Sequence, residues 1–320
     1  MISVLIVGLG KIGLGYDLAS DPTAHVLTHA RAVEQQAEFE LVGAVDPSPT
    51  RRELFEQVYG RPAHESISAA LEAHRPEFVI VAAPTQQHAA LVINVLECGA
   101  VSTILCEKPL AYGLADARAI VSACAARNVA LYVNYMRRSD PAVIEVKRRI
   151  ADGRMRAPIK GVVWYSKGLL HNGSHFFNLL QYWLGPVDAG RVIAPGREWE
   201  ARDPEPDLQV SFQRGDVVFL AAREEDYSHY TVELIASNGR LRYDAGGEQV
   251  EWQPVIADPI IQGAVTLDPI AEMIPSGMRR SQRHVMREFS RMLAGQDGEL
   301  CTGTEALQTL EALHALLEGR

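Results

Sequence analysis

The sequence contains little cysteine, and this scarcity excludes two kinds of site. Cys98, Cys106, Cys124 and Cys301 are scattered through 320 residues and form no Cys-x-x-Cys pair. Paired spacing is typical of zinc sites and disulfide frameworks. We therefore expect reduced, mostly buried thiols that neither bind a metal nor carry redox chemistry.

Positive charge and long apolar runs are also missing. The chain has 31 Lys and Arg against 40 Asp and Glu, a net charge of -9, and no basic cluster. Nucleic-acid binding requires such clusters to neutralise phosphates. No apolar run reaches the roughly 18 to 20 residues that span a bilayer, and the first residues lack a basic leader and a cleavage site. We expect a cytoplasmic protein with a small-molecule partner, no nucleic acid and no membrane contact.

The chain is too long for one typical hydrophobic core, and 47% of its residues are hydrophobic, so two domains are expected. In residues 1–135, short apolar runs alternate with helical patterns, which predicts a Rossmann-type, doubly wound parallel sheet. The predicted strands are 3–7, 40–45, 78–82, 102–106 and 130–133, and the predicted helices are 27–36, 51–59, 66–74, 86–98 and 114–127.

The rhythm changes in residues 136–320. Several consecutive strands with little helix between them favour antiparallel pairing. We therefore predict a second α/β domain with a largely antiparallel, open sheet. Its predicted strands are 160–165, 208–213, 217–223, 230–236, 240–244 and 248–253, and its helices are 141–151, 173–184, 278–293 and 303–318.

A glycine-rich turn follows the first predicted strand directly. In the run Gly8-Leu9-Gly10-Lys11-Ile12-Gly13, the first two glycines let the backbone turn tightly and approach a pyrophosphate, and the third permits close helix packing. Such turns also serve plain packing, but this one closes the first strand of a βαβ series. We predict cofactor contacts from Gly8, Gly10, Lys11, Ile12 and Gly13.

The end of the second predicted strand carries Asp46. A carboxylate at this point accepts hydrogen bonds from an adenosine ribose and repels a 2′-phosphate. NAD is therefore favoured over NADP. Arg51 and Arg52 could also reach a 2′-phosphate, so NADP stays open as the less favoured cofactor.

Asp46 lies 33 residues past Gly13, whereas about 20 is usual. The excess falls in residues 14–26. One interpretation is a tolerated surface insertion. The other is a loop that overhangs the active-site mouth with Tyr16, Asp17 and His25.

Two further turns end predicted strands of the same sheet. Cys106-Glu107-Lys108-Pro109 follows one strand, and Ala83-Pro84-Thr85-Gln86-Gln87-His88 follows the strand before it. Ligands bind at these strand ends, and a lysine there can hold a substrate hydroxyl and help to move its proton. The alternative is a surface loop with an ordinary Glu-Lys ion pair. We predict further cofactor contacts from Pro84, Thr85, His88, Glu107 and Lys108.

The segment 167–175, Lys-Gly-Leu-Leu-His-Asn-Gly-Ser-His, is a further candidate site in the second predicted domain. At helical spacing, His171 and His175 could share one face and form a metal pair. Zinc requires three or four ligands, and no partner cluster is visible, so we predict no metal. Either histidine could instead be a structural one.

Six motifs together carry a family resemblance: the Gly8/Gly10/Gly13 turn, Asp46, Pro84-Thr85-x-x-His88, Glu107-Lys108-Pro109, Arg137-Arg138-x-Asp140-Pro141 and Gly173-x-His175. In combination they resemble the Gfo/Idh/MocA family of nicotinamide-dependent sugar and cyclitol oxidoreductases over essentially the whole chain. The resemblance implies a Rossmann domain followed by an α/β domain whose open sheet carries substrate determinants and makes oligomer contacts. It also implies a homo-oligomer, a dimer or a tetramer.

By the same resemblance, Lys108 and His175 match the family's catalytic lysine and histidine. Family members often have an acidic residue four positions before that histidine, and this chain has His171 there, beside Asn172. An imidazole can accept a proton but supplies no fixed negative charge. Which histidine is the principal acid/base therefore stays open. The predicted substrate contacts are Lys108, Lys167, Asn172 and His175.

The segment 167–175 is also similar to that of members associated with bacterial surface-polysaccharide sugars. We therefore expect an NAD-dependent oxidoreductase that acts on a secondary alcohol or ketone of a sugar, with a nucleotide-activated sugar favoured. The alternatives are a cyclitol (inositol-type) dehydrogenase, a non-catalytic NAD-binding regulatory protein of the same fold, and an NAD-assisted elimination or epimerisation.

Overall fold

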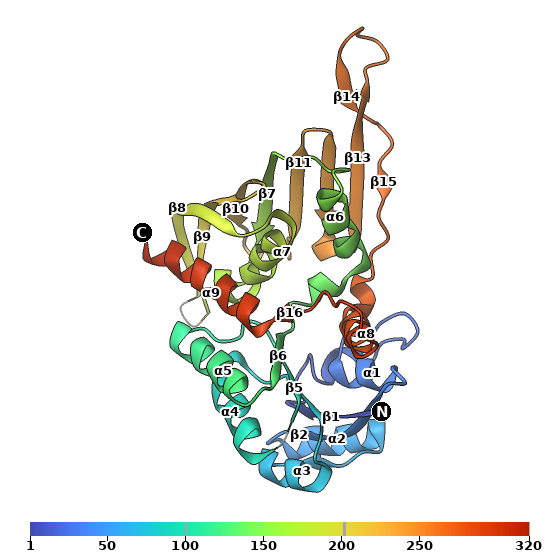
Figure 1. Cartoon of the computed structure of the whole chain (residues 1–320), viewed down its shortest axis with the longest axis vertical. Helices are drawn as coiled ribbons and strands as arrows, with labels where there is room; N and C mark the ends of the chain where they lie inside the picture. The colour runs from blue at the N-terminus through green and yellow to red at the C-terminus, as the bar shows by residue number, and fades with distance from the viewer. Residues whose placement is uncertain (100, 201–202, 320) are drawn as a thin grey trace. The chain divides into compact units, whose positions relative to one another are not determined.

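The computed structural model describes residues 1–99, 101–200 and 203–319. The chain forms two compact units (Figure 1). The first comprises Met1–Ser139 and Arg279–Gln308, and the second comprises Asp140–Met278 and the chain from Thr309 onward. The boundary expected at residue 135 is thus close to a unit boundary, but residues 279–308 group with the first unit and not with the second.

Within the described residues, the first unit contains a seven-stranded sheet in the order β16-β6-β5-β4-β1-β2-β3. Six strands are parallel, and β16 pairs antiparallel with β6 at the edge. This is the strand order of a Rossmann sheet, so the fold prediction is confirmed. The strands are β1 (Ile2–Val7), β2 (Phe39–Val45), β3 (Ala63–His64), β4 (Phe78–Val81), β5 (Thr103–Cys106), β6 (Ala130–Val133) and β16 (Cys301–Thr302).

Helices cover this sheet, and one of them comes from near the end of the chain. Helix α8 carries Val285, Met286 and Phe289, which are buried in one core cluster with residues of β1 and β4. The Phe289 ring lies 4.8 Å from that of Phe78, centroid to centroid. This burial is why residues 279–308 belong to the first unit. The helices are α1 (His29–Glu34), α2 (Pro49–Tyr59), α3 (Ile67–His74), α4 (His88–Cys98), α5 (Leu114–Ala126) and α8 (Ser281–Leu293).

The long spacing after the glycine turn is a loop that interrupts the first helix. The N–H of His29 donates to the carbonyl of Ile12 at 3.0 Å, and the N–H of Ala30 donates to that of Gly13 at 3.2 Å. The first residues of α1 therefore hydrogen-bond to the carbonyls of the glycine turn. Residues 14–28 form a loop between the turn and α1, which we call the excursion.

Asp17 holds this excursion together. It is 1% exposed, and its carboxylate accepts hydrogen bonds from the Leu27 N–H at 2.9 Å and from the Thr28 N–H and hydroxyl at 2.8 and 2.7 Å. The hypothesis that this side chain overhangs a site is therefore wrong for Asp17, because its oxygens are used inside the loop. Tyr16, in contrast, is 54% exposed.

Within the described residues, the second unit contains a nine-stranded sheet in the order β14-β13-β12-β11-β7-β10-β9-β8, with β15 beside β13. Only the β7–β10 pair is parallel among the described pairs, which confirms the largely antiparallel prediction. The strands are β7 (Ile159–Tyr165), β8 (Val187–Trp199), β9 (Asp203–Phe212), β10 (Gly215–Ala221), β11 (Thr231–Ala236), β12 (Gly239–Asp244), β13 (Gln249–Ala257), β14 (Val265–Leu267) and β15 (Glu272–Met273).

Helices pack on one face of this second sheet (Figure 1). Phe177 of α7 contacts Phe212 and Phe219 of the sheet, with ring centroids 5.9 and 5.7 Å apart. On the other face, Trp164 and Ile235 remain 38% and 47% exposed. The sheet is thus covered on one side only within the unit. The helices are α6 (Pro141–Ala151), α7 (Ser174–Leu184) and the part of α9 (Gly303–Glu318) from Thr309 onward, since its first residues belong to the first unit.

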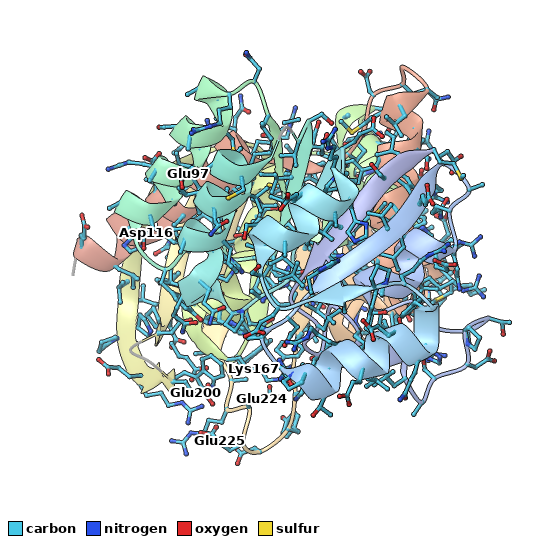
Figure 2. All side chains as sticks on the ribbon, turned by 90° about the horizontal axis from the view of Figure 1, so that it is seen from below. Glu97, Asp116, Lys167, Glu200, Glu224 and Glu225 are labelled. Atoms are coloured by element: carbon cyan, nitrogen blue, oxygen red, sulfur yellow. The ribbon has the colours of Figure 1, made fainter. Side chains whose placement is uncertain are left out.

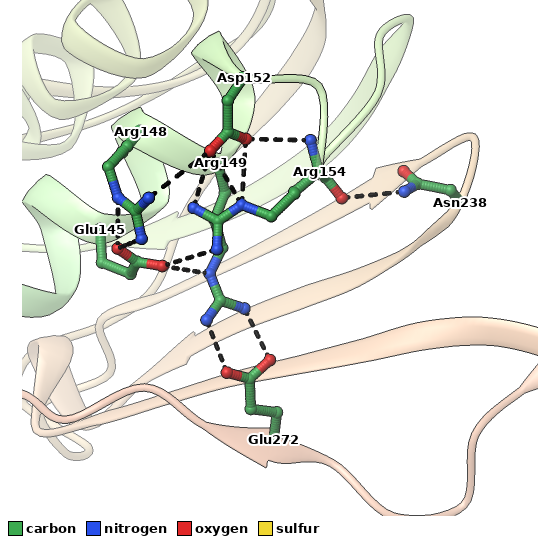
Figure 3. Close-up of polar contacts among 7 residues, drawn as sticks. All are labelled: Glu145, Arg148, Arg149, Asp152, Arg154, Asn238 and Glu272. Atoms are coloured by element: carbon green, nitrogen blue, oxygen red, sulfur yellow. Dashed lines mark hydrogen bonds and ion pairs between the residues drawn. The ribbon is translucent and has the colours of Figure 1, made fainter.

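The end of β13 forms an arm with β14 and β15, residues 255–273, that projects from this sheet (Figure 1). Its base is held by Arg149 of α6, whose guanidinium binds both oxygens of Glu272 at 2.8 and 2.6 Å (Figure 3). Exposed apolar side chains cover the arm: Ile260, Ile261, Val265, Ile270 and Met273. Among the described residues, no helix has the length and hydropathy of a membrane span.

Candidate cofactor and active site

A pocket of about 530 Å³ lies in the first unit at the carboxyl ends of β1, β2 and β4. The strand order reverses between β1 and β4, which is where open α/β sheets bind their ligands. The lining residues are Val7, Gly8, Gly10, Val45, Asp46, Pro47, Arg51, Glu65, Ser66, Ile67, Ala82, Ala83, Pro84, Gln87, Leu91 and Asn94.

The three glycines of the first turn differ in the space around the position that a Cβ would occupy. Gly8 has a φ of +104°, and a Cβ there would lie 2.6 Å from the carbonyl oxygen of Ala82. A Cβ on Gly13 would collide with the carbonyl oxygen of Gly8. A Cβ on Gly10 would meet no atom within 4 Å, because this residue faces the open pocket. Bare backbone beside an open pocket suits a pyrophosphate.

Asp46 connects the first two strand-to-helix turns. It is 2% exposed, and its carboxylate accepts hydrogen bonds from the Leu9 N–H at 2.8 Å and the Ser48 N–H at 2.9 Å. Both contacts hold the Asp46 side chain in the pocket wall where an adenosine ribose is expected.

The two arginines after Asp46 have different surroundings. Arg51 lines the pocket, is 55% exposed and lies 3.5 Å from the Asp46 carboxylate. Arg52 does not line it and instead donates to the main-chain carbonyls of Asp46 and Pro47. Glu65 adds a second acidic side chain to the wall, which the sequence analysis missed because β3 is only two residues long.

The pocket contains Gly8, Gly10, Asp46 and Pro84 of the predicted cofactor residues, but not the others. His88 is completely buried, and its nitrogens lie 2.9 Å from the carbonyl oxygen of Ala83 and 3.1 Å from that of Pro109. Burial lowers the pKa of His88. It therefore supports the β4 and β5 turns from inside. Outside the pocket lining are Lys11, Ile12, Gly13, Thr85, His88, Glu107 and Lys108.

Lys108 lies just past the end of β5 and is half-buried. The adjoining Glu107 carboxylate contacts His29 and Asn134, at 2.8 and 2.6 Å. Neither partner was predicted from the sequence. Asn134 follows the predicted strand 130–133 directly, so the rule that parallel strand ends meet at one sheet edge could have found it. His29 gives no such signal, because the excursion hides its position.

In the second unit, Lys167 precedes the helical turn η4 (Gly168–Gly173) that leads into α7. Its ammonium lies 2.9 Å from Glu224 (Figure 2). Glu224 also accepts hydrogen bonds from the hydroxyls of Ser166, Ser228 and Tyr230. Burial opposes ionisation, but these bonds lower the pKa of Glu224 to about 2. The cluster is a fixed, charged group of polar side chains.

Two buried carboxylates of β9 hold the same turn. Asp203 accepts hydrogen bonds from the N–H groups of Leu170 at 2.8 Å and His171 at 2.7 Å, and Glu205 accepts one from Gly168 at 3.1 Å. They are 3% and 1% exposed. Burial raises the pKa of Asp203 to about 6. Neither carboxylate was predicted from the sequence, because their partners are main-chain groups more than thirty residues away.

His175 lies on α7 and is 5% exposed, whereas His171 is half-buried with its ring 5.3 Å from that of Trp199. The Asn172 amide donates to the carbonyl of Ser166 at 3.0 Å. Among the described residues, no three His, Cys, Asp or Glu side chains are grouped to hold a metal ion. That Lys108 and His175 serve one reaction stays a prediction.

The strand order, the bare glycine backbone at the pocket and the acidic side chain after β2 define a dinucleotide-binding Rossmann fold. Residues 2–135 match the family model of the Gfo/Idh/MocA oxidoreductases, described as an oxidoreductase family with an NAD-binding Rossmann fold. This segment is less than half of the chain, and over it the chain is similar to the family that its motifs resemble.

Curated relatives match the chain over part of its length. A D-apiose dehydrogenase of Paraburkholderia graminis is 34% identical over 39% of this chain and 33% of its own, and an inositol 2-dehydrogenase of Rhizobium meliloti is 32% identical over 47% and 41%. The matches thus span a third to two fifths of these relatives. The WlbA dehydrogenase of Bordetella pertussis, solved with NADH and UDP-GlcNAcA, has the same fold, with 19% identity, a TM-score of 0.76 and coverage of 99% and 95%.

Proposed function

We propose that this protein is an NAD-dependent oxidoreductase that transfers a hydride between nicotinamide and a secondary alcohol or ketone of a sugar, with a nucleotide-activated sugar as the substrate. The observation that carries the proposal is the pocket at the reversal of strand order, where the Gly10 backbone is bare and Asp46 is buried in the wall. These groups suit a dinucleotide, with the pyrophosphate at Gly8 and Gly10 and a ribose at Asp46.

The protein's own task is to hold the carbinol carbon in place and to manage one proton. When bound, NAD supplies the hydride chemistry. The Lys108 ammonium polarises the substrate oxygen and stabilises its alkoxide character. His175 takes or returns the hydroxyl proton, and His171 or Asn172 orients it. Lys167, fixed by Glu224, contributes a polar contact to the substrate.

The inositol dehydrogenase among the relatives favours a second candidate, a cyclitol substrate. Both substrates present a ring carbinol, so Lys108 and His175 keep the same roles. Binding of the nucleotide portion distinguishes the two, because a cyclitol has none.

A screen of nucleotide sugars and cyclitols with NAD, followed by the absorbance of reduced nicotinamide, tests the proposal. We expect NADH to accumulate with a nucleotide sugar and not with the free sugar. Accumulation with a cyclitol alone supports the second candidate. NAD binding without turnover on any member of either class contradicts both and favours a regulatory protein, and conversion of substrate without net NADH indicates internal reoxidation.

A further inference from the structure

Four polar side chains from separate elements meet inside the first unit, next to Lys108. Glu107 follows β5, His29 begins α1, Asn134 follows β6, and Gln282 lies in α8. His29 Nε2 is 2.8 Å from Glu107 Oε1, Asn134 Nδ2 is 2.6 Å from the same oxygen, and Asn134 Nδ2 is 3.1 Å from Gln282 Oε1. His29 and Asn134 thus bind the Glu107 carboxylate directly, and Gln282 binds Asn134 from behind.

This carboxylate is expensive to bury unless it is hydrogen-bonded. The Glu107 side chain is 12% exposed, and His29, Asn134 and Gln282 are at most 3% exposed. Burial favours the neutral acid, but the hydrogen bonds from His29 and Asn134 outweigh it and hold the pKa of Glu107 below its usual range. Glu107 is therefore a buried anion.

The imidazole of His29 binds this carboxylate through Nε2. Its Nδ1 is buried and has no hydrogen-bond partner in the described part of the chain. Since a carboxylate only accepts, Nε2 is the ring nitrogen that donates to Glu107.

The retained charge acts on the next residue. Glu107 Oε2 lies 3.3 Å from the main-chain N–H of Lys108, and the charges of the two side chains attract each other. The other titratable groups that interact with Glu107 are Cys106 and His88. Burial raises the pKa of Cys106 and lowers that of His88, so both are uncharged at neutral pH. Among these groups, Lys108 is the cation that faces the buried anion.

We infer that His29 and Asn134 are positioning residues for Lys108 and that they act through Glu107. They fix the carboxylate, the carboxylate fixes the main chain of Lys108, and its charge attracts the Lys108 ammonium. This inference rests on the proposed function of Lys108. It also assigns a role to the excursion. The Asp17 carboxylate accepts hydrogen bonds from the N–H groups of Leu27 and Thr28, which directly precede His29.

The test uses side-chain NMR of ¹³C-labelled lysine, which does not depend on turnover. The lysines are Lys11, Lys108, Lys147, Lys160 and Lys167, and a Lys108→Arg variant assigns the relevant signal. We expect Lys108 to titrate at lower pH in His29→Leu than in wild type and at the wild-type pH in His29→Gln, whose amide nitrogen replaces Nε2. His74→Leu, the same change at a histidine that pairs with His64, is the control and should leave Lys108 unchanged.

Turnover gives the second readout. His29→Leu should lower kcat about tenfold or more, with little change in NAD affinity, and His29→Gln should restore most of it. An identical Lys108 titration in wild type and in His29→Leu overturns the inference. So does a loss that His29→Gln fails to restore. Absence of turnover in wild type overturns the proposed function alone, because the NMR titration still decides the inference.

Discussion

At the scale of single residues, Asp46 should set the choice between the two nicotinamide dinucleotides. Its carboxylate is buried in the pocket wall with Glu65 nearby in the lining, and a 2′-phosphate would meet like charge there. We predict that wild type binds NAD more tightly than NADP. Asp46→Ala should reduce the ratio of the NADP and NAD dissociation constants about tenfold or more.

Fluorescence titration with both cofactors measures this preference. Since Asp46 also accepts two main-chain hydrogen bonds, the melting temperature of the variant must be recorded beside the titration. A clear NADP preference in wild type would show that Arg51 dominates the pocket instead.

Asp203 should make the stability of the protein depend on pH. Its pKa is raised from 3.8 in the unfolded chain to about 6 in the folded state by burial. The folded state therefore keeps a proton that the unfolded chain has lost, and stability falls as pH rises from about 4 to about 6. The difference of about two pKa units corresponds to at most about 3 kcal/mol.

Chemical denaturation of Asp203→Asn between pH 4 and 7 checks this, because the amide does not ionise. As pH rises, the unfolding free energy of wild type should fall relative to that of Asp203→Asn. Asp216→Asn, at an exposed aspartate of the same unit, should show no such trend. A wild-type and Asp203→Asn difference that is constant across this pH range would contradict the assignment.

Single residues also show how far the candidate site follows from the sequence. Gly8, Gly10, Asp46 and Pro84 were predicted and meet at one pocket, because strand ends of a parallel sheet share an edge. Asp203 and His29 were not predicted, since their contacts depend on tertiary folding. A carboxylate that binds distant main-chain groups leaves no spacing pattern in the sequence.

At the scale of elements, strong local patterns predicted bounds well. The strand Ala130–Val133 and the helices Pro141–Ala151 and Gly303–Glu318 were predicted to the residue. Strand β8 (Val187–Trp199) was missed, because most of it is exposed and it contains Gly196 and register shifts. Such a strand is defined by its pairing with β9 and not by its own hydrophobic pattern.

An ion pair between Arg149 and Glu272 attaches the arm, residues 255–273, to α6. Arg149 is 10% exposed and binds Glu272 with both nitrogens of its fork, a strong geometry. We predict that Arg149→Ala raises the amide hydrogen-exchange rates of β14 and β15 severalfold or more. Mass spectrometry of exchange measures this directly.

Arg148→Ala is the matched control. Arg148 is the next residue on the helix, is 61% exposed and pairs with Glu145 and Asp152, not with the arm (Figure 3). It should leave the exchange rates of β14 and β15 unchanged. Equal exchange in wild type and Arg149→Ala would mean that backbone pairing with β13 alone holds the arm.

At the scale of the whole molecule, the second unit has an incompletely covered sheet. Val162, Trp164 and Ile235 are 37%, 38% and 47% exposed on one face, and the arm adds further exposed apolar residues. An antiparallel sheet can leave one face exposed to solvent, but apolar side chains on that face favour contact with a partner. We propose that a second copy of the chain covers this face, in a dimer or a tetramer.

Analytical ultracentrifugation at micromolar concentration tests the assembly. We predict a homo-oligomer that Trp164→Glu weakens by about tenfold or more in dissociation constant. Arg148→Ala, at an exposed position of α6 on the helix-covered side of the sheet (Figure 1), serves as the control and should associate like wild type. A wild-type monomer under these conditions would contradict the proposal.

The division into units shows the limit of sequence reasoning at this scale. The change of rhythm near Asp140 was visible, because a βαβ pattern gives way to consecutive strands. The sequence did not indicate that residues 279–308 belong to the first unit. The periodicity of α8 predicts that one face is buried, but it does not say which sheet covers that face.

We propose that Lys108 and His175 serve one reaction. The measurement that tests it most directly is kcat of Lys108→Ala and His175→Ala on the nucleotide sugar identified by the screen, with NAD affinity measured in parallel. We predict that each variant loses about a hundredfold or more in kcat while NAD affinity stays nearly unchanged. His171→Ala should lose less, and a larger loss there would make His171 the acid/base. Full activity in both Lys108→Ala and His175→Ala would contradict the mechanism.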